Sequence, residues 1–152
     1  MKNFTFKLQP VLDLRQRVEK DAANQLNSAR TEQAIALLAQ QAAERELNAG
    51  REEAALAATP AEGVAAGELH FYRTILDHLG DRSAESAGVV TLADLKVERT
   101  SQAYDHAVQE RSMLDRLEER HRESWRQMAL AGDRNAMDAV ALTRHLMAGR
   151  AQ

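Results

Sequence analysis

The chain has 152 residues and a formal net charge of −3, which is enough for one domain and small for two. It contains 28 alanines, and Ala, Glu, Lys, Leu and Arg together make up just over half of it, a composition typical of long helices or coiled coils. Valine and isoleucine are few and aromatic residues make up 4% of the chain. These proportions exclude a β-sandwich, a β-barrel or a wound sheet, and also a compact globule with a thick aromatic core.

Charge and cysteine content exclude further classes of protein. The absence of cysteine excludes disulfides, cysteine-ligated zinc and thiol nucleophiles, and it fits a reducing cytoplasm. The 20 basic and 23 acidic residues are interspersed, so we expect no nucleic-acid partner, which would require a basic excess. No apolar run approaches the ~20 residues of a transmembrane helix. Residues 1–10 lack the apolar core of a signal peptide.

A first long helix is predicted over residues 10–58. Pro10 suits the first helical position, and the residue before it is pushed toward extended geometry. From there to Ala58 the only helix breaker is Gly50. The sequence Thr59-Pro60-Ala61-Glu62 has the form of a capping box and closes this helix.

The middle segment, residues 59–90, carries four of the seven glycines and the whole net charge. Within it a short helix is predicted over about 68–79, where Leu69, Tyr72, Leu76 and Leu79 follow 3-4-3 spacing. A loop is expected from there to residue 90.

A second capping box at Thr91 to Asp94 predicts a second long helix over about 91–131. Gly132-Asp133 is expected to interrupt it, and a short terminal helix is predicted over about 136–148.

Apolar stripes indicate how the two long helices meet. On the second helix the stripe has 3-4-4-3 spacing and consists of Leu114, Leu117, His121, Trp125 and Met128. On the first helix it is weaker, contains a stutter that locally unwinds a supercoil, and consists of Val11, Leu14, Val18, Ala22, Leu26, Ala29, Ala36, Ala43, Leu47 and Ala54. Two such stripes predict an all-α fold, a long antiparallel two-helix coiled coil with short middle and C-terminal helical segments, forming a single domain over 1–152. A parallel dimer of single long helices and a compact bundle are the alternatives.

Catalytic and metal-binding motifs are not found. The sequence has neither a phosphate-binding loop nor a nucleophile elbow, and carboxylates on two thin helices would stay solvated. Glu118-x-x-His121 matches half of the pattern of di-iron bundles, but the second half is missing. The arginines between residues 111 and 126 alternate with carboxylates, as on a solvated coiled-coil face. We therefore expect no enzyme, no cofactor and no metal site.

The few aromatic residues are the candidates for contacts. Trp125 is expected to fill the seam between the helices. Phe71 and Tyr72 are adjacent, so their side chains point about 100° apart on a helix and one must lie off the apolar stripe. An exposed aromatic residue there would suit a partner protein.

These residues bear a resemblance to a known family. The opening Phe4-x-Phe6-Lys7-Leu8-x-x-Val11-Leu12-x-Leu14-Arg15 resembles that of the flagellar FliJ family, a stalk-like component of the bacterial type III export apparatus. The similarity resumes at Tyr72-Arg73-x-x-Leu76-x-x-Leu79 and at Arg111-x-x-Leu114-x-x-Leu117, and it covers nearly the whole chain.

The resemblance implies an antiparallel coiled coil like the central stalk of rotary ATPases, cytoplasmic and peripherally associated with the inner face of the cell membrane. It implies that the end with both termini docks into the hexameric export ATPase FliI. The residues that correspond to this contact are Phe4, Phe6, Leu8, Leu12 and Arg15. The opposite part would engage the export gate protein FlhA, and also export chaperones, through Phe71, Tyr72, Leu76 and Leu79. An injectisome stalk protein and a free-standing coiled-coil adaptor or chaperone are the other interpretations.

Overall fold

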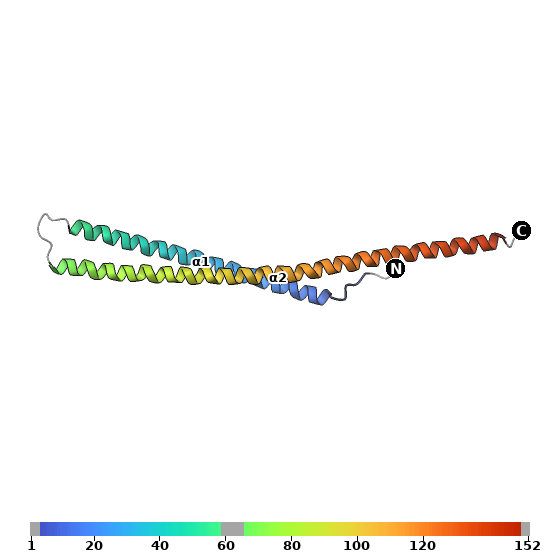
Figure 1. Cartoon of the computed structure of the whole chain (residues 1–152), viewed down its shortest axis with the longest axis horizontal. Coiled ribbons are helices and arrows are strands. Elements are labelled where there is room, and N and C mark those ends of the chain that lie inside the picture. The colour runs from blue at the N-terminus through green and yellow to red at the C-terminus, as the bar shows by residue number, and fades with distance from the viewer. Residues whose placement is uncertain (1–3, 59–65, 150–152) are drawn as a thin grey trace. The chain divides into compact units, whose positions relative to one another are not determined.

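The computed structural model describes residues 4–58 and 66–149, with side chains as far as residue 144 (Figure 1). Two helices account for nearly all of it: α1 (Gln9–Ala57) and α2 (Ala66–Gly149). The bounds of α1 agree to within one residue with the prediction of 10–58. The capping pattern predicted at 59–62 lies outside the described residues.

The prediction of three separate helices after residue 59 is wrong, because α2 is continuous from Ala66 to Gly149. The loop expected over 80–90 and the break expected at Gly132-Asp133 are both helical. Thr91 caps nothing: its hydroxyl donates to the carbonyl of Ala87, one turn earlier in the same helix. The helices predicted at 68–79, 91–131 and 136–148 are therefore parts of one element.

The chain divides into two compact units, each containing part of both helices. Unit 1 comprises Met1–Glu19 and Ala107–Gln152, and unit 2 comprises Lys20–His106. Whether the whole chain is a single domain stays a prediction.

In unit 2 the two helices run antiparallel. Arg82 pairs with Glu46 at 2.9 Å and Lys96 pairs with Glu32 at 2.6 Å, so residue numbers rise on α1 as they fall on α2. The buried and half-buried residues recur at 3-4 spacing along both helices. On α1 they include Leu26, Ala29, Gln33, Ala36, Gln40, Ala43, Leu47, Gly50 and Ala54, and on α2 Tyr72, Leu76, Leu79, Ser83, Ser86, Val90, Ala93, Val97, Thr100 and Tyr104. This is the seam of a left-handed coiled coil, and it explains why the glycines near residue 85 do not end the helix: its apolar face stays in use.

Gly50 occupies one of these seam positions and permits close packing. A β-carbon added there would lie 2.9 Å from Cδ1 of Leu79 and 3.5 Å from Cδ2 of Leu76. The absence of a side chain thus makes room for Leu79 of the facing helix, while Leu76 is at an ordinary contact distance.

In unit 1 the seam on α1 differs from the predicted one. Val11, Leu14 and Val18, expected inside, are exposed, while Leu12 is buried and Arg15 and Glu19 are half-buried beside α2. The 3-4 spacing seen in unit 2 is therefore also present on α1 in unit 1, and the predicted stutter is absent. Charged pairs across the seam, described below, make this arrangement possible.

The core is thin in both units. Among the described residues the buried apolar side chains are Phe6, Leu12, Leu26, Ala29, Ala36, Ala43, Ala93 and Ala107, and none of the large ones is completely buried. Because alanine removes little area from water, each large side chain that is buried accounts for much of the apolar contact. Neither helix, within the described residues, has a stretch apolar enough to cross a membrane.

Candidate functional site

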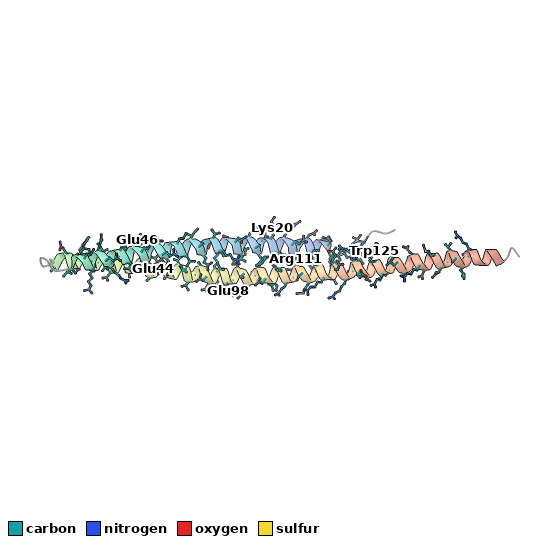
Figure 2. The ribbon with its side chains drawn as sticks, turned by 90° about the horizontal axis from the view of Figure 1, so that it is seen from above. Lys20, Glu44, Glu46, Glu98, Arg111 and Trp125 are labelled. Carbon is teal, nitrogen blue, oxygen red and sulfur yellow. The ribbon has the colours of Figure 1, made fainter. Side chains whose placement is uncertain are left out.

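The segment before α1 packs on α2 through aromatic contacts. Phe6 is 5% exposed and lies edge-on to His121, with ring centroids 5.8 Å apart. Phe4 is tilted against Trp125 at 6.1 Å, and the guanidinium of Arg122 lies 5.6 Å from the centre of the Phe4 ring. Such pairs contribute roughly 0.5–1.5 kcal/mol beyond the area they bury. Together these five residues fix the chain that leads into α1 (Trp125 is labelled in Figure 2).

Four charged side chains cross the seam of unit 1, and we call them the charged layer: Arg15, Glu19, Glu110 and Arg111. Arg15 donates to Glu110 at 2.7 Å, and Arg111, labelled in Figure 2, donates to Glu19. Arg111 also pairs with Asp115 on its own helix. The hydrogen bond with Glu19, more than any other contact, raises the pKa of Arg111 above its usual value. All four side chains are 20–38% exposed, so they are only partly desolvated.

Glu118 and His121, the half-motif for a metal, have other partners in the structure. Glu118 accepts a hydrogen bond from Arg122, one turn later on α2, and His121 packs against Phe6. No group of three metal-ligating side chains occurs in the described part of the chain.

Unit 1 also has apolar side chains that are exposed on its surface. Three of them, Val11, Leu14 and Val18, lie on one face of α1, and we call them the outer stripe. Leu14 is the most exposed of the three, at 56%. Farther along, α2 extends past α1 without a facing helix in either view (Figures 1 and 2). Exposed apolar residues on this extension are Met128, Leu130, Met137, Val140 and Leu142.

In unit 2 a second apolar surface lies where α1 ends and α2 begins. Phe71 is 61% exposed, and its ring meets that of Tyr72 edge-on at 5.9 Å. Leu56 and Leu69 are also exposed. Beside them is a shallow groove of about 290 Å³, lined by Ala54, Ala57, Ala58, Leu69, Tyr72, Arg73, Leu76 and Asp77. The small alanines of α1 opposite Tyr72 and Leu76 leave this groove open.

The residues singled out from the sequence divide into buried and accessible ones. Phe6 and Leu12 are buried within the chain, Arg15 belongs to the charged layer, Phe4 is half-buried and Leu8 is 36% exposed. In unit 2, Phe71 is the member of its aromatic pair that lies off the seam, while Tyr72, Leu76 and Leu79 are half-buried in it. Trp125 was expected to fill the seam; it packs on Phe4 and remains partly exposed.

Three features were missed at the level of sequence: the charged layer, the outer stripe and the role of Gly50. A heptad count that allowed charged residues in the seam would have found Leu12, Arg15 and Glu19 in phase with Leu26. That count could have been made from the sequence alone. The residues around Gly50 in the sequence, by contrast, do not indicate that Leu79 packs against it.

Comparison with known proteins identifies the family. The model of a family described as flagellar FliJ protein matches residues 4–150. No curated protein and no solved structure matches the chain. Because the match spans nearly the whole chain, the chain belongs to the flagellar FliJ family.

Proposed function

We propose that this FliJ-family chain is a non-enzymatic coupling protein of the flagellar type III export apparatus, which contacts the export ATPase FliI through unit 1 and the export gate protein FlhA through unit 2. Family membership gives it a flagellar export-related role. The observation that supports the finer assignment is that both units carry exposed apolar side chains. They are Leu8, Val11, Leu14 and Val18 in unit 1, and Leu56, Leu69 and Phe71 in unit 2. A coupling protein needs two such surfaces, whereas a single-partner adaptor needs one.

The ATPase contact is assigned to unit 1. Phe4, Phe6, Leu8, Leu12 and Arg15 are the residues that the family resemblance associates with it. Since Phe6 and Leu12 are buried within the chain, we assign them to holding this end in shape. The direct contacts then belong to accessible neighbours, of which Leu8 is one.

The gate contact is assigned to the surface around Phe71 in unit 2. An exposed aromatic ring beside a shallow apolar groove provides an anchor for a partner, because large rigid rings contribute much of the energy of an interface. Tyr72 meets the ring edge-on, and Leu76 and Leu79 are half-buried in the seam beside α1. Export chaperones would use the same part of the chain, and contact with the gate would bring the protein to the inner face of the cell membrane.

The proposal is tested by separating the two contacts. Purified FliI and the cytoplasmic part of FlhA are each mixed with the wild-type chain, with Leu8→Ser and with Phe71→Ser, and binding and ATP hydrolysis are measured. We expect Leu8→Ser to weaken binding to FliI alone and Phe71→Ser to weaken binding to FlhA alone. Leu92→Ser is the matched control, because this leucine of α2 is exposed and belongs to neither surface.

Three results would contradict the assignment. If the wild-type chain binds neither protein at micromolar concentration, the coupling role is wrong. If it instead suppresses client aggregation without any dependence on the ATPase, the chain is a free-standing chaperone. If it binds and stimulates only an injectisome ATPase, it belongs to that system, against the flagellar description of its family.

A further inference from the structure

The beginning of α1 carries two stripes that could each form a seam. The stripe that faces α2 consists of Leu12, Arg15 and Glu19, while the outer stripe, one residue earlier at each position, is entirely apolar. Arg15 and Glu19 are half-buried in the seam, while the three residues of the outer stripe are 38–56% exposed. Charged side chains thus lie where an amphipathic helix usually places apolar ones. Unit 1 therefore contains a local conflict between its packing and its hydrophobic pattern.

The facing part of α2 shows a matching ambiguity. Glu110 and Arg111 are both half-buried, and so are Leu117 and Glu118, although neighbouring residues on a helix point in different directions. The face is thus broad enough to meet α1 in more than one orientation.

The spacing of the apolar residues agrees on the two helices. On α2, Leu114, Leu117, His121 and Trp125 are separated by intervals of 3, 4 and 4 residues. On α1, the outer stripe and Ala22 are separated by the same intervals. This 11-residue spacing belongs to helices that pack without the left-handed supercoil of a heptad repeat. The stretch of α2 with this spacing begins at Leu114, opposite Leu12, and runs past Phe6. Within the interface made by residues 9–19, the second pattern therefore belongs to the outer stripe of α1.

We propose that unit 1 has a second packing phase, in which residues 9–19 of α1 turn by about 100° around the helix axis and place the outer stripe against α2. The segment that covers Val11, Leu14 and Val18 is then α2 of the same chain. The charged layer holds the observed phase. Ion pairs as accessible as these contribute little each. The second phase buries the outer stripe but exposes Leu12, which is buried in the observed phase, so its gain in apolar burial is partly offset.

Turning the helix changes which surface unit 1 presents. In the observed phase the outer stripe faces outward, and in the second phase Arg15 and Glu19 leave the seam. A partner that covers the outer stripe would hold the observed phase, and one that binds the released charges would hold the second. This inference concerns the chain by itself and does not depend on the proposed partners.

The absence of cysteine allows a direct test by disulfide trapping, since every introduced thiol pair is the only one. The antiparallel register set by the contacts of Arg15 with Glu110 and of Phe6 with His121 places Leu114 opposite Leu12. The pair Leu12→Cys/Leu114→Cys therefore reports the observed phase, and Val11→Cys/Leu114→Cys the second. Asp13→Cys/Leu114→Cys is the matched control, because Asp13 is exposed on the other side of α1.

The full-length chain is oxidised briefly, and intramolecular cross-linking is read from the faster-migrating monomer on a non-reducing gel. We expect the Leu12 pair to form most, the Val11 pair to form less, and the Asp13 pair to stay at background. In a second set of variants, each cysteine pair also carries Arg15→Gln and Glu19→Gln. These changes should raise the ratio of the Val11 product to the Leu12 product on the order of fivefold. Val18→Lys should lower the same ratio.

Two results would overturn the proposal. One is a Val11 product no more abundant than the Asp13 product in every background. The other is a parallel rise of all three products when the charges are removed, because fraying exposes every side of α1 equally whereas turning favours one.

Discussion

Arg15 of α1 donates a 2.7 Å hydrogen bond to Glu110 of α2 at a position in the seam where the spacing of a coiled coil calls for an apolar side chain. Glu19 and Arg111 repeat the arrangement one turn farther along α1, with the charges reversed between the helices. Partly desolvated pairs of this kind are more useful for fixing which faces meet than for overall stability, because removing the charges from water offsets much of their attraction.

The first prediction concerns the coupling between Arg15 and Glu110. We expect Arg15→Ala and Glu110→Ala each to destabilise the chain by about 1 kcal/mol, and a double-mutant cycle to give a coupling energy of about 0.5–1 kcal/mol. Urea unfolding followed by circular dichroism measures it. Arg82 and Glu46 form the control pair, since both are about half exposed and should couple more weakly. Equal coupling energies in the two pairs would mean that partial burial does not strengthen the ion pair between Arg15 and Glu110.

The second prediction compares Gly50, which lies in the seam, with Gly88, which lies outside it. Gly88→Ala should stabilise the chain by about 1 kcal/mol, because a β-carbon there meets nothing within 4 Å and alanine is the better helix former. Gly50→Ala has the same gain in propensity but pushes a methyl group against Leu79, so we expect it to fall short of Gly88→Ala by about 1 kcal/mol. Thermal unfolding of the two variants measures the difference. The same stabilisation in both would show that the close approach at Gly50 is not restrictive.

Much of the fold followed from the sequence, because composition and spacing act over whole helices. The antiparallel pairing, the bounds of α1 and the stripe from Tyr72 to Leu79 depend on periodicity summed over many residues. The breaks predicted in α2 rested on single residues, and there the reasoning failed. Gly132 is tolerated inside a helix at a cost of about 1 kcal/mol, which a long continuous element can absorb.

The candidate sites were less predictable than the fold. Phe71 could be identified as one of two aromatic residues that cannot share a stripe, but only the structure shows that Tyr72 is the one nearer the seam. Leu12 was predicted as a contact residue but not as part of the seam, because Val11, Leu14 and Val18 form the more apolar stripe. Arg15 and Glu19 lie in the seam because they pair with Glu110 and Arg111 on α2. These partners are 95 and 92 residues farther along the chain, so no local pattern reveals them.

The third prediction separates residues that hold the structure from residues that are free to contact a partner. Phe6→Ala should destabilise the chain by about 3 kcal/mol, because Phe6 is buried against His121 and its removal leaves a cavity there. Phe71→Ala should change stability by less than about 1 kcal/mol, because most of its ring is exposed. Urea unfolding curves of the two variants measure the contrast. A large loss for Phe71→Ala would mean that its ring supports unit 2 and is unsuited to be a separable contact.

The last prediction concerns acid. The hydrogen bond from Lys96, the largest cause, lowers the pKa of Glu32 below its ordinary value of 4.5, so the folded chain binds this proton less readily than the unfolded chain. The stabilisation is therefore present above pH 4.5 and is lost as the pH falls below it. Glu32→Gln should lower the urea midpoint at pH 7 and leave a smaller deficit at pH 3. Glu53→Gln, at an exposed position of the same helix, is the control for the general effect of removing a carboxylate. A deficit for Glu32→Gln that stays constant between the two pH values would show that the ionised carboxylate of Glu32 does not stabilise the fold through Lys96.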